Sequence, residues 1–264
     1  MHSAPDFLER RFQTAAAHYR KGRAPYPARL IDDVADMLHL SPADRLMDLG
    51  CGPAQLAAAF APSVGQVLAL DPEPLMLELA RETVHGLDNV TVARGSSDDL
   101  RPELGSFRAV LIGRAFHWMD RPETLRRCEA LLGQDGAVVL FGDQRPAIPE
   151  NGWVREYEAL LERWSATDAE RARRKSDAFL PHISVLLDSA FSRLRRVSVV
   201  WRRPLTLDDL IQRALSQSST SRARLGEGAE EMIDELHAEA AGWNSEGRFV
   251  EVLESSALIA QRAR

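Results

Sequence analysis

Met47-Asp48-Leu49-Gly50-Cys51-Gly52-Pro53-Ala54 is the stretch that decides the fold of this 264-residue chain. An apolar run from Arg45 to Asp48 precedes the two glycines, and a helix-like stretch from Ala54 to Ala61 follows them. Glycine permits backbone angles that other residues avoid, and it lets a ligand approach the main chain closely. We therefore expect a strand, a tight turn and a helix, with a ligand at the carboxyl end of the strand.

Short apolar runs and amphipathic stretches alternate along the chain on either side of this turn. Further strands are expected at Val67 to Asp71, Val90 to Arg94, Ala109 to Ile112, Ala137 to Phe141, Arg196 to Trp201 and Ala257 to Gln261. Further helices are expected at Phe7 to His18, from Pro27 onward, and at Pro74 to Val84, Pro122 to Leu132, Trp153 to Trp164, Asp168 to Leu187, Leu207 to Leu215 and Gly228 to Ala241. Alternation of this kind supplies the crossovers of a parallel sheet. The sequence predicts an α/β fold with a Rossmann-like, doubly wound, mostly parallel seven-stranded sheet.

The domain organisation that we expect has four parts. Residues 1–40 form an N-terminal helical lid segment, and residues 41–145 form the Rossmann-like core that carries the ligand site. Residues 146–192 lack an apolar strand and are rich in Arg and Glu, which predicts a helical cap after the fifth strand. Residues 193–264 contribute further strands and helices that complete the core.

Composition excludes several classes of function. A formal net charge of −6 gives no overall attraction to phosphate backbones, so we expect no nucleic acid partner. The arginine clusters at 171–175 and 193–203 are interpreted as solvated faces of a helix and a strand. The two cysteines form no metal-type array, so we expect no metal and a reducing, cytoplasmic location. No apolar run reaches the length of a signal sequence core or a membrane span, and we expect a monomer or homodimer away from membranes.

Two acidic residues indicate which cofactor the glycine turn binds. Asp48, ahead of the glycines, would repel a pyrophosphate but accepts hydrogen bonds from an ammonium group or from water. Asp71 ends the second predicted strand, about twenty residues after the turn, where such folds place a carboxylate on the ribose hydroxyls. The alternative for Asp71 is a helix cap. The pair disfavours a dinucleotide and favours a cationic nucleoside cofactor.

The segment from Tyr19 to Phe141 resembles the class I S-adenosylmethionine-dependent methyltransferases, in particular the UbiE-like, methyltransferase-11 family. The family motif on the first strand is similar to Met47 to Pro53, which includes Gly50, Cys51 and Gly52, and the ribose acid matches Asp71. The resemblance implies S-adenosylmethionine as the cofactor and S-adenosylhomocysteine as its product.

The same resemblance implies which residues surround the adenine. Pro72 to Met76 corresponds to the apolar stretch beside the ring, so Pro72 and Met76 are expected to contact it. Family members carry Gly-Asp-Ala-x-x-Leu after the third strand, where this chain has Gly95 to Leu100 with Ser96 in place of the acid. Asp98 is expected to replace that acid, with the Ser97 amide beside a ring nitrogen. A solvent-facing turn is the alternative.

Two further segments resemble the family near the reacting groups. Tyr19 to Pro27 is similar to Y-x-x-x-R-P-x-Y-P, which implies that Tyr19 and Arg23 close over the methionine end of the cofactor and Tyr26 borders the substrate. The alternative for Arg23 is a surface anchor. Gly113 to Asp120 resembles the loop that faces the transferred methyl group, with Arg114 and Ala115 toward the cofactor and Phe116, His117 and Trp118 toward the acceptor.

His117 is the candidate general base, because an imidazole with a pKa of about 6.5 can accept the proton of a hydroxyl or ammonium acceptor. A structural hydrogen bond to the backbone is its alternative role. The aromatic residues of the predicted cap are expected to line an apolar acceptor pocket, although helix packing explains each of them as well: Trp153, Tyr157, Trp164, Phe179 and His182.

We therefore expect a methyltransferase that acts on O, N or C of a small-molecule metabolite. Two alternatives remain open at this point: an S-adenosylmethionine-binding enzyme that catalyses another reaction, such as a cyclisation, and a cofactor-binding protein without catalysis.

Overall fold

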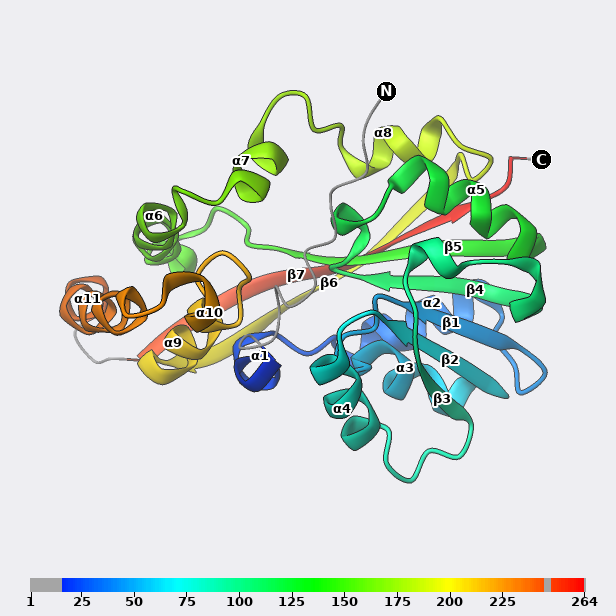
Figure 1. Ribbon diagram of the computed structural model, residues 1–264, viewed down its shortest axis with the longest axis horizontal. Helices are drawn as coiled ribbons and strands as arrows, with labels where there is room; N and C mark the ends of the chain where they lie inside the picture. The colour runs from blue at the N-terminus through cyan, green and yellow to red at the C-terminus, as the bar shows by residue number, and fades with distance from the viewer. Residues whose placement is uncertain (1–15, 245–247, 264) are drawn as a thin grey trace.

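A single seven-stranded sheet forms the centre of the computed structural model, which describes residues 16–244 and 248–263 (Figure 1). Its strands are β1 (Arg45–Leu49), β2 (Gln66–Asp71), β3 (Val90–Arg94), β4 (Phe107–Gly113), β5 (Leu132–Gln144), β6 (Arg193–Thr206) and β7 (Arg248–Gln261). The strand order is β3-β2-β1-β4-β5-β7-β6, in which β1 to β5 are parallel and β7 is antiparallel to both neighbours. The predicted Rossmann-like, mostly parallel sheet is confirmed.

Helices cover both faces of the sheet, as a doubly wound fold requires. One layer contains α2 (Ala28–Leu38), α3 (Gln55–Phe60) and α4 (Pro74–Thr83), and the other contains α5 (Arg121–Leu131) and α8 (His182–Leu187). Because side chains alternate along a strand, Leu46 of β1 joins the first apolar cluster and Met47 joins the second. Single-turn 3-10 helices complete the connections: Ala61–Ser63, Ser97–Asp99, Pro102–Leu104, Phe116–Trp118 and Pro149–Asn151.

The antiparallel pair β6 and β7 extends well beyond the rest of the sheet. β5 pairs with β7 from Glu254 to Gln261, whereas β6 pairs with β7 along its whole length from Arg248. The outer part of this ribbon carries a helical lobe, which lies to the left of the core in Figure 1. The lobe consists of α6 (Val154–Ser165), α9 (Leu207–Leu215), α10 (Arg222–Leu225) and α11 (Gly228–Trp243).

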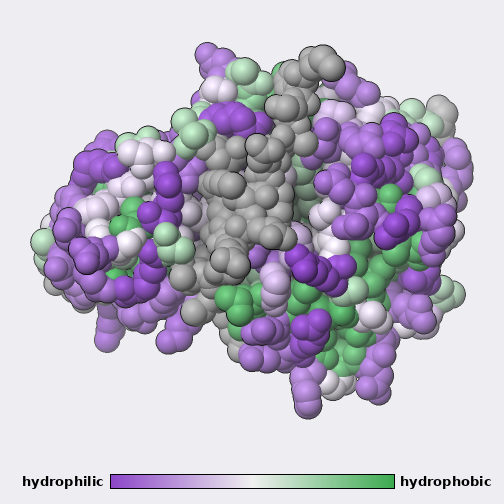
Figure 2. Space-filling model, viewed as in Figure 1, coloured by the Kyte–Doolittle hydropathy of each residue, from purple (hydrophilic) through white to green (hydrophobic). Residues whose placement is uncertain are grey.

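The lobe has its own apolar core, in which Leu160 of α6, Leu210 of α9 and Leu236 of α11 are fully buried with Phe249 of β7. Helices from two separate parts of the chain therefore build it. The predicted cap, residues 146–192, supplies α6 and α7 (Ala169–Lys175), while its last helix, α8, packs on the core beside α5. The outer face of the lobe is mostly hydrophilic (Figure 2).

The single helix predicted from Asp168 to Leu187 is wrong, because the structure has two helices, α7 and α8, in its place. α7 ends at Lys175, and Pro181 directly precedes α8. Proline lacks the amide hydrogen that a continuous helix needs, and it forces the residue before it out of the helical region. The break gives α7 and α8 independent directions, toward the lobe and the core respectively.

The N-terminal helix is described only from its last part, because the predicted helix over residues 7–18 begins outside the described residues. α1 (Ala16–Gly22) lies against α9 of the lobe, where His18 Nδ1 is 2.7 Å from Gln212 Oε1. A Cβ atom on Gly22 would lie 2.6 Å from the Gln212 carbonyl oxygen, so this close approach requires glycine. Within the described ranges, no helix is long and apolar enough to cross a membrane.

Candidate functional site

The glycine turn between β1 and α3 contains three residues with left-handed backbone angles. Gly50 and Gly52 have φ of 68° and 52°, and Ala54 has φ of 59°. A Cβ atom on Gly50 would lie 2.8 Å from the Cβ of Ala115, so the loop after β4 approaches the turn more closely than any side chain there would permit. Both loops thus meet at the carboxyl edge of the parallel strands, where open α/β folds bind ligands.

Asp71 ties the end of β2 to this turn. Its Oδ2 accepts a hydrogen bond from the Gly52 amide at 2.8 Å, and its Oδ1 accepts one from the Glu73 amide at 2.9 Å. The side chain is buried, which raises its pKa, while the two amide donors oppose that shift. Each oxygen retains a further lone pair, so capping of the chain turn and binding of a ribose are compatible.

Asp48 and Cys51 lie behind the turn, and neither is among the residues that line the cavity described below. The Asp48 carboxylate accepts a hydrogen bond from the Ala57 amide at 3.0 Å, and burial raises its pKa to about 7. Neither side chain is exposed to that cavity, so the expected binding of the cofactor by Asp48 and Cys51 stays a prediction without support from the lining. Asp48 instead stabilises the start of α3, because its carboxylate satisfies an amide of the first helical turn.

A cavity of about 800 Å³ opens on the turn and continues toward the lobe. The remaining residues predicted to bind the cofactor all line it: Tyr19, Arg23, Gly50, Gly52, Asp71, Pro72, Met76, Ser97, Asp98, Arg114 and Ala115. The predicted base His117 and the predicted acceptor residue Trp118 line it as well. The fold thus brings most of the residues that were predicted for the site to the lining of one cavity.

One end of the cavity has the features expected beside an adenine ring. Met76 and Ser97 are both buried. Ser96 caps a short turn, since its hydroxyl accepts from the Asp98 amide at 3.1 Å and the Asp99 carboxylate accepts from the Ser96 amide at 2.8 Å. Asp98 stands at the rim, with a side chain that is 78% exposed and 3.1 Å from Arg127. Its exposure makes it available to a ligand from the solvent side.

Arg23 and Arg114 lie near the glycine turn, and each has a buried guanidinium nitrogen without a hydrogen-bond partner among the described residues. Arg114 donates to Asp143 at 2.8 Å and to the Ala24 carbonyl at 2.8 Å, and its guanidinium lies over the Tyr26 ring at 4.4 Å. Its Nη1 is buried without a partner, and so is Nε of Arg23. Burial and the nearby Arg114 and Arg213 guanidinium groups lower the pKa of Arg23. Unmade hydrogen bonds of buried charged groups are costly, so this corner is suited to an anionic group.

His117 lies between two rings at the side of the cavity. The centroid of its ring is 4.9 Å from that of Trp118 and 6.5 Å from that of His182, with which it is stacked. Burial is the main cause that lowers its pKa well below the usual value, and Arg174 and His182 lower it further. The imidazole is therefore neutral at pH 7, which is the form that accepts a proton.

Four aromatic residues predicted to border the substrate lie outside the cavity lining, which corrects that prediction. Trp153 and Tyr157 are buried in the lobe, where they donate to the carbonyls of Val250 and Leu210, both at 2.9 Å. Phe116 is buried in the core against α8, and Tyr26 packs edge-on to Phe141 at 5.4 Å. These side chains stabilise the lobe and the sheet, because an aromatic ring contributes most to the free energy of folding where its surface is fully buried.

Three further aromatic residues considered for the pocket also lie outside its lining. Trp164 donates to Glu235 on the neighbouring helix of the lobe. Phe179 packs against His182 at 6.1 Å, and His182 reaches the site only by stacking on His117. The predicted apolar acceptor pocket is thereby replaced by a different kind of surface.

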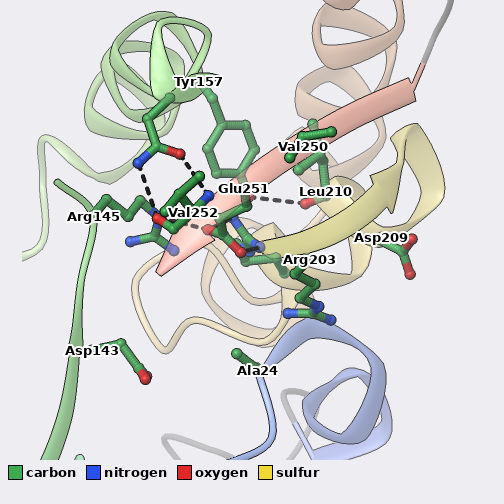
Figure 3. Close-up of polar contacts among 12 residues, drawn as sticks. Ala24, Asp143, Arg145, Tyr157, Arg203, Asp209, Leu210, Val250, Glu251 and Val252 are labelled. Carbon is green, nitrogen blue, oxygen red and sulfur yellow. Dashed lines mark hydrogen bonds and ion pairs between the residues drawn. The ribbon is translucent and has the colours of Figure 1, made fainter. Parts of the chain in front are cut away.

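That surface is polar, and we call it the lobe-side wall: Arg145, Arg171, Arg174, Arg213, Gln217, Ser218, Ser219, Glu251 and Leu253. Glu251 is fully buried at its centre (Figure 3). Its carboxylate accepts two hydrogen bonds from Arg213, at 2.8 and 2.6 Å, and one from Arg145 Nε at 2.6 Å. A carboxylate held by two guanidinium groups is rigid, so this part of the wall is preorganised.

Arg171 and Arg174 bring α7 into the same wall. Arg171 pairs with Glu162 at 2.7 Å, and the guanidinium of Arg174 lies 4.4 Å from the centroid of the Trp118 ring. The interpretation of this arginine cluster as a solvated face is corrected for these two residues, which occupy one face of the helix at a spacing of three. Two features of the sequence could have indicated this wall: the spacing of three between the arginines, and a glutamate between two valines in β7.

Comparison with known proteins agrees with the fold and the turn. A family model described as a methyltransferase domain matches residues 46–136. An uncharacterized methyltransferase of Mycobacterium tuberculosis is 28% identical over 78% of this chain and 76% of its own length. A probable S-adenosylmethionine-dependent methyltransferase of Saccharomyces cerevisiae is 26% identical over 57% of this chain and 56% of its own. The crystal structure of a methyltransferase from Thiobacillus denitrificans, in complex with S-adenosyl-L-homocysteine, superposes with a TM-score of 0.55 at 15% identity, over 97% of this chain and 99% of that one.

The domain match and these relatives show that the chain carries a methyltransferase domain, on a sheet with this strand order. The neighbour from Thiobacillus denitrificans holds S-adenosyl-L-homocysteine, the product of the cofactor that the sequence resemblance implies for this chain. The narrower resemblance to the UbiE-like group stays a prediction.

The residues present fit this cofactor. Asp71 offers acceptor oxygens to a ribose, the turn at Gly50 and Gly52 leaves the main chain open, and the unpartnered donors of Arg23 and Arg114 suit a carboxylate. No group of three or more His, Cys, Asp and Glu side chains among the described residues is arranged to hold a metal ion.

Proposed function

We propose that this methyltransferase acts on a small molecule that enters the cavity between the glycine turn and the lobe. The observation that carries this proposal is the continuity of one cavity of about 800 Å³ from Gly50 to Leu253 of the lobe-side wall. That volume lies within the range of about 300–1,000 Å³ typical of small-molecule sites. A space bounded on the far side by the lobe suits a compact acceptor better than a polymer.

We assign the donor to the half of the cavity beside β1 and β2. Asp71 accepts hydrogen bonds from the ribose, Pro72 and Met76 lie against the adenine, and Ser97 and Asp98 bind its polar edge. Tyr19, Arg23, Arg114 and Ala115 surround the methionine end, where the donors left over on the two arginines bind the carboxylate. The burial of Met76 and the position of every one of these residues on the cavity lining support the assignment.

We assign the acceptor to the other half, beside His117 and Trp118. When bound, S-adenosylmethionine supplies a methyl group that its sulfonium activates for displacement. The protein then has to align the acceptor and remove its proton. His117 is neutral, lies on the cavity and accepts that proton from a hydroxyl or amine of the acceptor. Trp118 forms a flat surface beside it.

A transfer assay with labelled methyl donor tests the proposal. The purified chain is incubated with labelled S-adenosylmethionine and a mixed extract that contains small molecules, protein and nucleic acid. Label is expected in the small-molecule fraction, with the product identified by mass spectrometry. Label confined to protein or nucleic acid would contradict a small-molecule acceptor, and the same assay with heat-denatured chain gives the background.

A further inference from the structure

We propose that Asp143 and Ser255 are positioning residues for the methyl donor, because together they hold the Arg114 guanidinium with one nitrogen free to bind the carboxylate of the donor. This inference rests on the proposed function, which assigns that carboxylate to Arg23 and Arg114. Three observations carry it: a hydrogen-bond network that ends at Arg114, the burial of its members, and the guanidinium nitrogen that the network leaves without a partner among the described residues.

The register of the sheet brings the members of this network together. Asp143 of β5 lies directly opposite Ser255 of β7, and Ser255 in turn lies opposite Val199 of β6. Trp201 is two residues beyond Val199, so its side chain is on the same face of the sheet as that of Ser255. Directly opposite and diagonal neighbours on one face are close enough to interact. The strands alone therefore place the three polar side chains beside one another.

Ser255 connects the indole of Trp201 to the carboxylate of Asp143. The indole Nε1 donates to the Ser255 hydroxyl oxygen at 3.0 Å, and the same hydroxyl donates to Oδ1 of Asp143 at 2.6 Å. An indole only donates and a carboxylate only accepts, so the direction of both hydrogen bonds is determined. Ser255 is fully buried, and its hydroxyl is therefore held in one orientation by its two partners.

Asp143 holds Arg114 through its other oxygen. Oδ2 accepts a hydrogen bond from Nε of Arg114 at 2.8 Å and lies 2.5 Å from Nη2. Only 14% of the Arg114 side chain and 15% of the Asp143 side chain are exposed. A buried ion pair needs further hydrogen bonds to the remaining oxygens of its carboxylate, and Ser255 supplies one to Oδ1. The carboxylate is thus fixed from both sides.

The hydrogen-bond donors of Arg114 are only partly used within the protein. Nε donates to Asp143, and Nη2, which contacts Asp143, also donates to the Ala24 carbonyl at 2.8 Å. Nη1 is buried and has no partner among the described residues. Because Arg114 lines the cavity, a carboxylate of a bound ligand would satisfy the N–H groups of Nη1.

The backbone at Arg114 is held as firmly as its side chain. Its φ of 57° lies in the left-handed region, which residues with a Cβ atom seldom adopt. The preceding Gly113 permits a close approach, because a Cβ atom there would lie 2.6 Å from the Tyr26 hydroxyl oxygen. The ring of Tyr26 then lies 4.4 Å from the Arg114 guanidinium. Uncommon backbone angles persist where the surroundings hold them, and they cluster at functional sites.

Asp143 also allows two arginines to approach the same carboxylate. Burial lowers the pKa of Arg23 most, and the guanidinium of Arg114 is among the groups that lower it further. The negative charge of Asp143 offsets this repulsion. The position of the carboxylate in turn affects the position of the methyl group, since both belong to one molecule, and a misplacement of about 1 Å can slow a reaction about 100-fold.

Binding of two donor analogues to the full-length chain tests the inference. S-adenosylhomocysteine has the carboxylate, and 5′-methylthioadenosine lacks it. Dissociation constants of both labelled compounds are measured by equilibrium dialysis for the wild type, Asp143→Asn, Ser255→Ala and Ser255→Thr. We expect Asp143→Asn to weaken the binding of S-adenosylhomocysteine about tenfold and Ser255→Ala about threefold, with 5′-methylthioadenosine unaffected. Ser255→Thr keeps the hydroxyl and should restore most of the affinity.

Ser256→Ala is the matched control, because Ser256 is the next residue of β7 and its side chain points to the other face of the sheet. It should bind both compounds as the wild type does. Arg114→Gln, alone and combined with Ser255→Ala, shows whether Ser255 acts through the guanidinium. If it does, Ser255→Ala has no further effect in the Arg114→Gln background, whereas independent losses would add. Asp143→Asn replaces Ser255→Ala in this comparison if the latter does not fold.

Three outcomes overturn the inference: equal losses for both compounds in Asp143→Asn and Ser255→Ala, unchanged affinity for S-adenosylhomocysteine in these variants, or losses that add to that of Arg114→Gln. If Arg114→Gln alone selectively weakens S-adenosylhomocysteine, the assigned carboxylate contact stands and only the positioning role is rejected. If Arg114→Gln binds both compounds normally, that contact and the positioning role both fail. The labelled-donor assay decides separately whether the methyl acceptor is a small molecule.

Discussion

Oδ2 of Asp71 accepts a hydrogen bond from the amide of Gly52 at 2.8 Å, which joins the end of β2 to the glycine turn after β1. The other oxygen, Oδ1, binds the Glu73 amide at 2.9 Å. Two backbone donors therefore fix the carboxylate in one orientation at the cavity. A side chain that is held in this way offers its remaining lone pairs to a ligand without losing further conformational freedom.

Asp71→Ala is expected to weaken the binding of S-adenosylmethionine by about 1.5–3 kcal/mol, the value of hydrogen bonds to a charged group. The dissociation constant should rise about 10- to 150-fold in equilibrium dialysis with labelled donor. Asp88→Asn, at an exposed position away from the cavity, is the control and should bind normally. Unaltered affinity in Asp71→Ala would show that the carboxylate has only its structural role.

Arg23→Gln tests whether this arginine binds the methionine carboxylate of the donor. Its Nε is buried without a partner and the residue lines the cavity, so the variant should bind S-adenosylhomocysteine about tenfold more weakly. Its affinity for 5′-methylthioadenosine, which lacks that carboxylate, should stay the same. Lys21→Gln, an exposed neighbour, serves as the control. Equal losses for both ligands would mean that Arg23 shapes the site without contacting the carboxylate.

Asp48→Asn should change how stability depends on pH. Burial raises the pKa of Asp48 from its ordinary value of about 3.9 to about 7. Between these values the folded protein holds a proton that the unfolded chain releases, so stability falls as the pH rises through this window. The amide of the variant does not titrate, and it can still accept from the Ala57 amide. We expect the variant to gain in Tm relative to the wild type as the pH rises from about 4 to 7.

Thermal unfolding of both proteins over this pH range measures the effect, with Asp88→Asn as the exposed control. The comparison of each variant with the wild type removes the contributions of other titrating groups. If Tm changes with pH in the same way in Asp48→Asn and in the wild type, the pKa of Asp48 is not raised in the folded protein.

His117 should influence turnover without influencing the binding of the donor. His117→Ala is expected to lower kcat by about 100-fold, the lower end for a general base, while affinity for S-adenosylhomocysteine stays close to that of the wild type. Because burial and Arg174 lower the pKa of His117, its protonation should reduce kcat only well below pH 6.5. His85→Ala, at an exposed histidine, is the control. An unchanged kcat, or an acidic limb centred near pH 6.5, would rule out this role.

The donor half of the site could be predicted from the sequence because local rules determine it. Gly50 and Gly52 directly follow an apolar strand, and Asp71 ends the next one, so a parallel pairing of β1 and β2 brings them together whatever the rest of the chain does. The same adjacency placed Arg114 to Trp118 after β4 at the same edge. The resemblance to known methyltransferases added the residues beside the adenine.

The acceptor half could not be predicted in the same way, because long-range packing determines it. Trp153 and Tyr157 have the spacing of a helix face, but the sequence does not show that α9 and α11 bury that face. Arg171 and Arg174 were predicted to be solvated, because the contact of Arg174 with the Trp118 ring depends on where α7 ends before Pro181. Glu251 is a single charge in an apolar strand, and its partners Arg145 and Arg213 are 106 and 38 residues away in sequence.

Calorimetric titration of the intact chain with S-adenosylhomocysteine is the most direct test of the central claim, that this cavity is a methyltransferase site. One molecule should bind per chain, and labelled methyl groups should pass from S-adenosylmethionine to a small molecule in the same preparation. Absence of heat, with no protection of the protein against thermal unfolding by either compound, would contradict the claim and every functional assignment made from it.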